Sequence, residues 1–424
     1  MFDGWQAREI SNAWVKLVIV PQLGGRLMQV VFDGHAYLFV NPKYKGQYFP
    51  PSEGAEKGKW FNYGGDKIWP LPEGTEDEHH WPGPLSDVLD DGEYKFQVLS
   101  EGSRCAVKLE GVADARTGLQ YSREITLLSD SPAVKFHAVM KNSSHRRIEW
   151  SMQSVTQYDT EDASKPAGYN REFWAFAPAN PHSAYLEKYH VRSGLANDPS
   201  FSVSAGWFRL HWLPLMNEVW LDSREGWIAV VDGISRYAMV ERFTFHPGAE
   251  YPGKASVIFY KNGATLEIDQ QGQPALTSHQ PDSAPRYMEA ELNSPMVALE
   301  PGQTYAMDTE WFPVRAGKEL SGVTKSGVAG TTLVAQRTAN GIQLRGTIGV
   351  FFAGTLKAQL CDRRKTLLAT VDLGHVDPRE FITLGKEIAA PEAAEHVTLH
   401  LVDLHGVDRG ALGTASVQPK LGSS

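Results

Sequence analysis

Cysteine is scarce in this chain of 424 residues, which excludes a disulfide framework. The only two cysteines, Cys105 and Cys361, lie far apart and form no Cys-x-x-Cys pair. Long apolar runs are also missing, because no stretch of about 18 apolar residues exists that could span a membrane. The first residues, Met1–Trp5, show neither the basic nor the apolar region of a signal peptide. We therefore expect a cytoplasmic protein, although a chain whose leader had been cleaved would look the same.

An excess of basic residues is absent too. The 50 acidic and 41 basic residues give a formal net charge of −9, whereas nucleic-acid binding needs a basic patch or stripe. The Gly-x-x-x-x-Gly-Lys phosphate loop, the strand-to-helix Gly-x-Gly-x-x-Gly turn, the Gly-x-Ser-x-Gly elbow and the His-Glu-x-x-His zinc motif are all missing. We therefore expect no nucleic-acid partner, no membrane partner and no cofactor. The sequence leaves the oligomeric state open.

Long helical periodicity is the last absence, and strand patterns take its place. The best candidate helix, Pro391–Glu395, is very short. Apolar or alternating segments bounded by Gly, Pro, Asn and Asp recur with the spacing of a large antiparallel sandwich. The expected strands are Trp14–Val20, Leu27–Phe32, Tyr37–Val40, Tyr94–Leu99, Cys105–Gly111, Leu119–Leu128, Ala133–Asn142, Glu149–Gln157, Phe208–Trp212, Trp227–Val231, Met239–Thr244, Ala255–Tyr260, Tyr287–Leu292 and Tyr305–Phe312.

A second, smaller domain is expected at the C-terminal end. Gly, Ser, Thr and Lys become common between residues 315 and 330, and no tryptophan occurs after Trp311. We divide the chain into a first domain at 1–316 and a small immunoglobulin-like β-sandwich at 317–424. The tail Ala411–Ser424 is expected to be loose. The expected strands of this domain are Thr332–Arg337, Ile342–Val350, Leu356–Cys361, Leu367–Asp372 and Val397–Asp403.

The segment Asn62–Gly74 carries the most informative residue types. Its two adjacent glycines can supply a turn with positive φ that brings the backbone close to a ligand. Asp66 and Lys67 can hydrogen-bond a polyol, and Trp69 offers a flat apolar face to a sugar ring. Since no apolar alternation runs through the segment, we predict a binding loop rather than a core strand. The alternative is a structured loop whose tryptophan plugs the edge of the core.

Two polar clusters contain metal-binding residue types without a metal-binding pattern. His79 and His80 follow the acidic residues 76–78, and adjacent residues on a strand point apart, so a solvated loop is the favoured interpretation. Their position just after the Asn62–Gly74 segment keeps both histidines as site candidates. Three acids between Asp159 and Asp162 could offer oxygens to Ca²⁺, but such loops are usually only solvated. We expect no metal.

Acid–base candidates outside that segment begin with Glu289 and Glu291, which share one face of the strand Tyr287–Leu292. If that face lined a concave site, repulsion would raise the pKa of one carboxyl and make it a plausible general base. The alternative is a solvent-facing pair with the apolar residues between them turned to the core. His246 lies where a strand runs into a turn and is a further acid–base candidate. The alternative is that His246 has a purely structural role. Less specific candidates are His182, His190 and His211.

Three groups of segments together resemble the galactose-mutarotase-like superfamily. Pro21–Val30 is similar to the opening hairpin of aldose 1-epimerases, in which a Gly-Gly-Arg turn precedes the second strand. Asn62–Pro70 resembles the Gly-Gly-Asp-Lys-Trp-Pro signature of the DUF4380 branch. The last sheet of that branch is resembled by Tyr251-Pro252, Ser256–Asn262, Met288–Pro295, Leu299–Gln303 and Glu310-Trp311. The resemblance covers about residues 8–315, and it implies an antiparallel β-supersandwich that binds carbohydrate in a concave face.

The chain departs from the superfamily at the proton donor. Aldose 1-epimerases use a histidine acid on a central strand and a glutamate base late in the domain. The corresponding strand here, Glu149–Tyr158, carries Gln153 and Gln157 and no histidine. Glutamine hydrogen-bonds hydroxyls but transfers no proton at neutral pH. An epimerase would then need one of the two strand glutamates as base and a loop histidine, such as His80 or His246, as acid.

The sequence therefore predicts a carbohydrate-binding protein and leaves its activity open. Acid–base chemistry of epimerase or lyase type is the leading hypothesis; in a lyase, Lys67 or an arginine would neutralise a substrate carboxylate and Tyr158 or His246 would take the proton. A non-catalytic carbohydrate-recognition protein is the alternative, and a structural role for the C-terminal domain is a third. The predicted catalytic residues are Glu289, Glu291, His246 and His80. The predicted substrate-binding residues are Asp66, Lys67, Trp69, His79, Gln153, Gln157, Tyr158 and Arg26.

Overall fold

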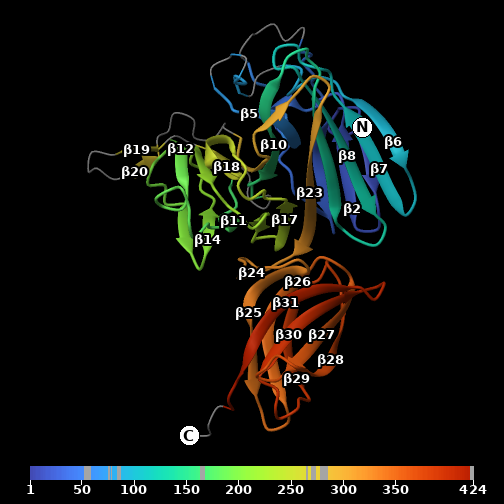
Figure 1. The fold of residues 1–424 in the computed structure, drawn as a ribbon, viewed down its shortest axis with the longest axis vertical. Helices are drawn as coiled ribbons and strands as arrows, with labels where there is room; N and C mark the ends of the chain where they lie inside the picture. Colours follow the sequence, from blue (N-terminus) through green and yellow to red (C-terminus); the bar gives the residue numbers. More distant parts are fainter. Residues whose placement is uncertain are drawn as a thin grey trace. The chain divides into compact units, whose positions relative to one another are not determined.

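The protein is almost entirely β-structure, as Figure 1 shows. The computed structural model describes residues 1–51, 59–74, 77, 79–83, 87–162, 168–263, 266–268, 274–276 and 285–420. Among these residues there is no α-helix, only the short 3₁₀ segments Pro42–Tyr44 and Pro252–Lys254. Nothing in this described part is therefore a helix long and apolar enough to cross a membrane. The predicted all-β class is confirmed.

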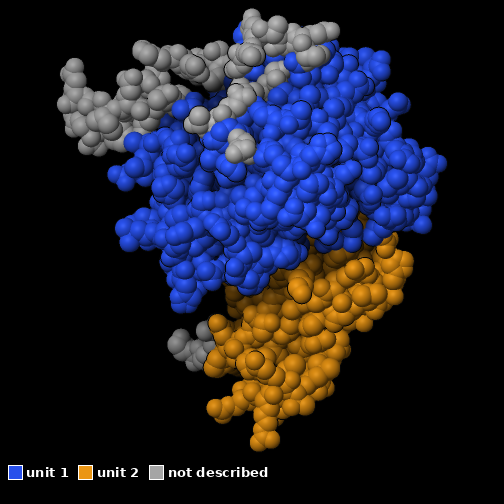
Figure 2. All heavy atoms as spheres, turned by 45° about the horizontal axis from the view of Figure 1, so that its top comes forward, with its two compact units in different colours: residues 1–129, 134–230, 241–311 blue, residues 130–133, 231–240, 312–424 orange. Residues whose placement is uncertain are grey.

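The chain divides into two compact units, coloured separately in Figure 2. Unit 1 comprises residues 1–129, 134–230 and 241–311. Unit 2 comprises residues 130–133, 231–240 and 312–424.

Two large sheets carry most of the strands that precede the C-terminal part of the chain, and all of their pairings described here are antiparallel. The first sheet runs in the order β1 (Arg8–Ser11), β2 (Val15–Val20), β3 (Arg26–Phe32), β5 (Asp66–Leu71), β10 (Ile148–Asp159), β21 (Tyr287–Asn293), β18 (Val257–Asn262), β15 (Asn217–Leu221) and β12 (His190–Gly194), with β4 (His35–Ala36) beside β3 and β22 (Val297–Leu299) beside β10. The second runs β13 (Phe201–Ser204), β14 (Trp207–His211), β11 (Phe173–Pro178), β16 (Trp227–Asp232), β17 (Tyr237–Phe243), β23 (Thr304–Arg315), β9 (Val134–Asn142), β8 (Leu119–Leu128), β7 (Arg104–Glu110) and β6 (Lys95–Ser100). A separate hairpin joins β19 (Leu266–Ile268) and β20 (Pro274–Leu276).

The two sheets pack face to face, and burial follows from that packing. From Leu119 to Ile125, strand β8 alternates buried and half-buried residues, as expected when one face meets the core and the other meets water. The central strands β5 and β21 are instead buried at every residue. One face of each therefore packs against the second sheet, and the other face is covered as well.

The prediction of a binding loop at Asn62–Gly74 is wrong for the central part of the segment. Residues 66–71 form β5, which lies between β3 and β10 in the first sheet. Burial of both faces removes the apolar–polar alternation by which a half-exposed strand is recognised, because each face carries its own polar groups. The alternative of a tryptophan packed at the core edge is closer, since Trp69 is only 4% exposed.

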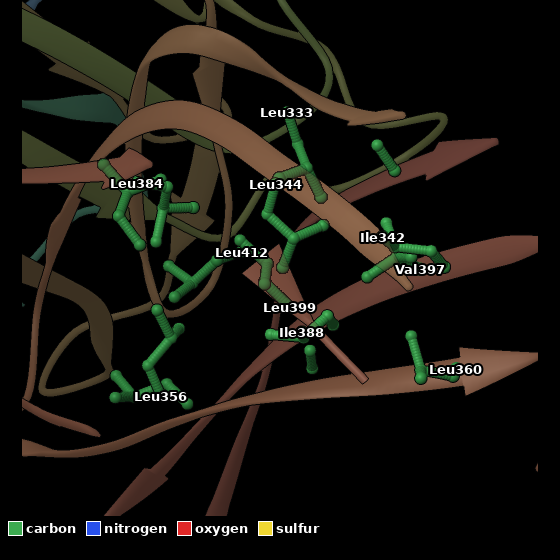
Figure 3. Close-up of a cluster of buried hydrophobic side chains, with 14 of the residues drawn as sticks. Leu333, Ile342, Leu344, Leu356, Leu360, Leu384, Ile388, Val397, Leu399 and Leu412 are labelled. Carbon is green, nitrogen blue, oxygen red and sulfur yellow. The ribbon is translucent and has the colours of Figure 1, made fainter. Parts of the chain in front are cut away.

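Unit 2 contains one sheet ordered β28 (Leu367–Val376), β27 (Gly354–Cys361), β30 (His396–Asp403), β31 (Asp408–Gln418), β25 (Gly327–Arg337), β26 (Ile342–Val350) and β29 (Ile382–Ile388), with β24 (Gly322–Val323) beside β25. β27 and β30 alternate strictly between buried and half-buried residues. Their inward side chains, among them Leu356 of β27 and Leu399 of β30, join Leu344 of β26 in the apolar core of Figure 3.

Two predictions for the C-terminal part are wrong. Pro391–Glu395 forms a turn closed by one hydrogen bond from the Ala394 N–H to the Pro391 carbonyl, because five residues are too few for a stable helix. The supposedly loose tail forms β31 as far as Gln418, which pairs with β30 and β25. Because the residues of this tail are small, its sequence shows little apolar pattern. Hydrogen bonding of its backbone to the neighbouring strands orders it instead. Residues 421–424 lie outside the described part.

Candidate functional site

Gly64 and Gly65 shape the start of β5 and pack against protein backbone. Their φ angles are +94° and +76°, which side chains rarely tolerate. A Cβ at Gly64 would lie 2.2 Å from the Phe39 carbonyl oxygen, and one at Gly65 would lie 2.7 Å from the Leu27 carbonyl oxygen. The glycines therefore let the chain pass tightly packed backbone before it enters the sheet.

The strand register places polar and aromatic side chains on one face of the first sheet. Residues paired across neighbouring antiparallel strands share a face, and residues two apart on one strand do so too. One row joins Lys67 of β5, Val155 of β10, Glu291 of β21, Ile258 of β18 and Trp220 of β15. The next row joins Gln157, Glu289, Tyr260 and Glu218, and Trp69 pairs with Gln153 alongside.

This face is hollowed into a cavity of about 430 Å³. Its walls include three indoles, those of Trp60, Trp69 and Trp220, and the carboxyl groups of Glu289 and Glu291. Pockets of this size, with apolar walls and a few convergent polar groups, are typical of small-molecule sites. Further polar lining comes from Gln153, Glu218, Arg192 and the exposed Glu73.

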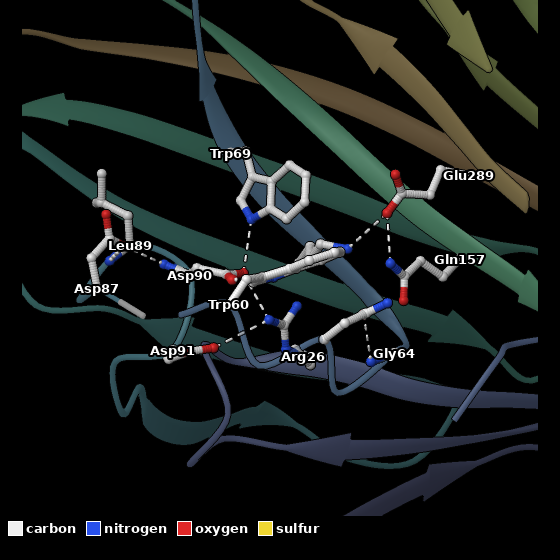
Figure 4. Close-up of polar contacts among 12 residues, drawn as sticks. Arg26, Trp60, Gly64, Trp69, Asp87, Leu89, Asp90, Asp91, Gln157 and Glu289 are labelled. Carbon is white, nitrogen blue, oxygen red and sulfur yellow. Dashed lines mark hydrogen bonds and ion pairs between the residues drawn. The ribbon is translucent and has the colours of Figure 1, made fainter. Parts of the chain in front are cut away.

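The two buried glutamates of the cavity have different partners. Glu289 accepts hydrogen bonds from the Lys67 ammonium at 3.3 Å and from the Gln157 amide at 2.6 Å, as Figure 4 shows. Glu291 accepts only from the Gln153 amide among the hydrogen bonds found in the described residues. Burial, reinforced by the negative charge of Glu289, raises the pKa of Glu291 well above its ordinary value. The cavity thus holds two carboxyl groups side by side, Glu289 paired with an ammonium and Glu291 bonded to an amide.

Asp90 fixes two of the indoles. Its Oδ1 accepts from Trp69 Nε1 at 2.8 Å, and its Oδ2 accepts from Trp60 Nε1 at 3.0 Å. The guanidinium of Arg26 lies 2.7 Å from Asp90 Oδ1 and neutralises it (Figure 4). Arg26, predicted to bind substrate, is 1% exposed and lies behind the tryptophans. The ammonium of Lys67 lies 4.2 Å from the Trp69 ring centroid, so cation and indole are also held together.

Half of the eight predicted substrate-binding residues are brought together: Lys67, Gln153 and Gln157 bond to Glu289 or Glu291, and Trp69 pairs with Gln153. Two predicted residues face the opposite way and are corrected here.

Asp66 is completely buried, forms an ion pair with Arg123 of β8 and accepts a hydrogen bond from Thr156 at 3.0 Å. Tyr158 donates to Glu241 of β17 at 2.6 Å. Both residues are one position out of phase with Lys67 and Gln157, and therefore point into the layer between the sheets. Neither is placed to bind or deprotonate a ligand in the cavity.

The predicted histidines are not in the cavity wall in the described part of the chain. His80 lies 2.9 Å from the carboxylate of Asp77 in an exposed segment, and His79 is exposed as well. His246 is exposed, and its backbone N–H donates to the Tyr251 hydroxyl. The prediction of His80 or His246 as the catalytic acid is therefore wrong for this cavity.

The less specific histidine candidates lie elsewhere too. His211 stacks on Trp174 at 4.0 Å between ring centroids, and His190 stacks on Tyr185 at 5.7 Å. His182 does not line the cavity formed by the described residues. Among the described residues, no group of three or more His, Cys, Asp or Glu side chains is arranged to hold a metal ion. Glu76 and Glu78 lie outside the described residues.

Sequence reasoning missed Trp60, Asp90, Glu218 and Trp220. The pair Glu218 and Trp220 had a readable signal, because polar and aromatic residues alternate with Val219 and Leu221 on one strand. Asp90 had none, since its role depends on partners 21 to 64 residues away in the chain.

No protein-family profile and no curated protein sequence matches the chain. Among solved structures, the Slr1438 protein from Synechocystis sp. PCC 6803 is similar with 9% identity, over 73% of this chain and 96% of that one, at a TM-score of 0.47. A galactose mutarotase-like protein from Lactobacillus casei is 10% identical over 73% and 100% of the two chains, at 0.45. A GalM/aldose epimerase homologue from C. elegans is 11% identical over 74% and 99%, at 0.40. Identities and TM-scores this low support no argument about ligand or activity.

Proposed function

We propose that unit 1 binds a carbohydrate in the cavity between Trp69, Trp220, Glu289 and Glu291. The observation that supports this proposal is the strand register, which puts indoles, carboxyl groups and amide groups on the same hollowed face of the sheet. Indoles pack against the C–H faces of a sugar ring, while carboxyl and amide oxygens accept hydrogen bonds from its hydroxyls. The sequence resemblance to the mutarotase-like superfamily points the same way, and membership of its DUF4380-type branch is part of the proposal.

The unequal glutamates favour a second candidate function, acid–base chemistry at the anomeric carbon. Glu289 would take the proton of the anomeric hydroxyl while Glu291 protonates the ring oxygen, which breaks the ring C–O bond and forms the aldehyde. Closure on the other face, with both protons returned, gives the other anomer. Two adjacent carboxyl groups with different partners, of which Glu291 has a raised pKa, suit such a proton exchange. Glu291 thus replaces the loop histidine as the acid.

A lyase acting on an acidic sugar has less support. The cavity wall contains the acids Glu73, Glu218, Glu289 and Glu291 against Arg192, and Lys67 is already paired with Glu289. A substrate carboxylate would be repelled there. The non-catalytic recognition protein remains the alternative and differs from the isomerase only in turnover.

Sugar binding is tested by thermal shift against neutral and acidic saccharides. A sugar at about 100 times its Kd stabilises the native state by about 2.7 kcal/mol, which raises the Tm by several degrees. Trp69→Leu is expected to abolish the shift, whereas Trp14→Leu, at a partly buried tryptophan outside the cavity wall, is expected to retain it. An unchanged Tm with every sugar would refute the proposal.

Catalysis is tested by following the interconversion of a single starting anomer by NMR. Glu291→Gln is expected to slow the catalysed rate by about 10²–10⁴-fold, because the amide keeps the shape of the neutral acid and has no proton to transfer. The same variant is expected to bind the sugar about as well as the wild type. Glu110→Gln on β7 serves as the control. If the wild type binds the sugar without accelerating interconversion, the non-catalytic alternative holds.

A further inference from the structure

A second hollow adjoins the cavity on unit 1. It has a volume of about 950 Å³, and its wall includes Phe245, Tyr251, Arg224 and Lys254. Gly253 belongs to the walls of both hollows. The two hollows therefore share one exposed backbone position, which we call the ridge.

The ridge has no room for a side chain at Gly253. Its φ is +54°, and a Cβ there would lie 1.9 Å from the Trp220 ring. Any other residue would displace the indole that forms the cavity wall. The Gly253 carbonyl accepts a hydrogen bond from the Tyr185 hydroxyl at 2.5 Å, which anchors the ridge between the two hollows from its other side. The backbone at Gly253 is thus held in place.

The second hollow has its own flat aromatic surface. The half-buried Phe245 stacks on the buried Tyr251 with ring centroids 5.3 Å apart and planes 8° apart. Because Tyr251 also accepts the His246 N–H at 3.0 Å, the ring pair is held in place. A preorganised aromatic surface loses little conformational entropy when a ring packs on it.

The charges around the second hollow are balanced. Arg224 and Lys254 oppose Glu250 and Asp222, and all four line it. Asp222 is occupied by the distant segment 180–184, accepting from Asn180 at 3.0 Å, Ser183 at 2.7 Å and the Ala184 N–H at 2.8 Å. A surface with no dominant charge and an aromatic face suits an uncharged, hydroxyl-rich ligand.

We infer that the ligand is a neutral oligosaccharide, with one unit in the Trp69–Glu289 cavity and the next lying across Gly253 against Phe245. The inference rests on the proposed carbohydrate binding and adds the length and charge class of the ligand. A monosaccharide would fill the first cavity alone. Each further unit would gain contacts only if the chain continues past the ridge.

The test is calorimetric titration with malto-, cello-, manno- and galacto-oligosaccharides of one to four units. In at least one series the affinity is expected to rise about tenfold or more between one unit and the longer members. Phe245→Ala and the milder Phe245→Leu are expected to remove most of that gain and leave monosaccharide affinity unchanged. Phe96→Ala, at a half-buried ring outside both hollows, is the control and is expected to keep the gain.

The possible outcomes distinguish the oligosaccharide inference from the proposal of carbohydrate binding itself. Affinity that does not depend on chain length overturns the oligosaccharide inference while carbohydrate binding stands. So does a Phe245→Leu protein that stays folded and loses affinity equally for one unit and for four, or that loses none. Failure of every sugar to bind overturns the carbohydrate function, and the inference falls with it.

Discussion

At the scale of single residues, the direction of a side chain decides its role. Asp66 and Lys67 are neighbours on β5, yet Asp66 pairs with Arg123 between the sheets and Lys67 pairs with Glu289 in the cavity. The Asp66 pair is fully buried, so each charge depends on the other for its loss of solvation. Asp66 is thus a structural residue beside one that holds a carboxyl group of the proposed site.

Asp66→Asn is expected to lower the free energy of unfolding by about 3–5 kcal/mol, because the Arg123 charge stays buried without its anion. The sugar affinity of the folded variant is expected to match the wild type. Denaturant unfolding and calorimetric titration measure the two quantities. Asp308→Asn removes the exposed partner of His137 and is expected to change stability little. Intact stability with lost sugar binding would show that Asp66 contacts the ligand after all.

At the scale of elements, β5 depends on the two glycines that precede it. Gly64 combines a left-handed φ with a neighbour that leaves no room for a Cβ. Gly34, in the turn between β3 and β4, has a similar φ of +79° with nothing within 4 Å of its Cβ position. Comparing substitutions at Gly34 and Gly64 therefore separates the free-energy cost of backbone strain from that of steric crowding.

Gly34→Ala is expected to cost about 1–3 kcal/mol of stability through backbone strain alone. Gly64→Ala is expected to cost clearly more, because the clash with the Phe39 carbonyl adds an overpacking penalty of about 1–3 kcal/mol. It should also weaken sugar binding, since any shift of β5 moves Lys67 and Trp69. Chemical unfolding of both variants, followed by titration, provides the measurement. Equal losses would mean that the chain around Gly64 adjusts freely.

At the scale of the whole molecule, the pKa values of one acid in each unit are shifted in opposite directions. In unit 1, burial raises the pKa of Glu241 to about 8. In unit 2, burial acts to raise the pKa of Asp403, but hydrogen bonds from the Val407 N–H and Arg409 outweigh it and lower that pKa. The stability that Asp403 contributes is therefore lost only when the pH falls below the usual pKa range of an aspartate. Glu241 instead changes the stability in the neutral pH range.

Unit 1 is expected to lose stability as the pH rises from about 4.5 to about 8. In that window the unfolded chain releases the Glu241 proton while the native state keeps it, which costs up to about 1.4 kcal/mol per pH unit for this group. Glu241→Gln is expected to flatten the slope by that amount. Tryptophan fluorescence follows unit 1 alone, because no tryptophan occurs after Trp311. An identical slope in the variant would contradict the assignment.

The strand-rich fold could be predicted because period-two patterns and turn residues are local signals. Leu119–Leu128 was predicted with the bounds that β8 has, and Glu289 and Glu291 were placed on one strand face from their spacing alone. The domain bounds 1–316 and 317–424 stay a prediction, as do the sugar-binding roles.

Long-range pairing settled the rest. Lys67 meets Glu289 across 222 residues, and whether that face of β21 meets water or a cavity depends on strands β5, β10 and β18 aligning beside it. The free energy of such a pairing depends on both strands together, so no local stretch of sequence determines it. For the same reason the sequence could name Asp66, Tyr158 and the histidines as candidates, while only the packed sheets showed that they face away from the site.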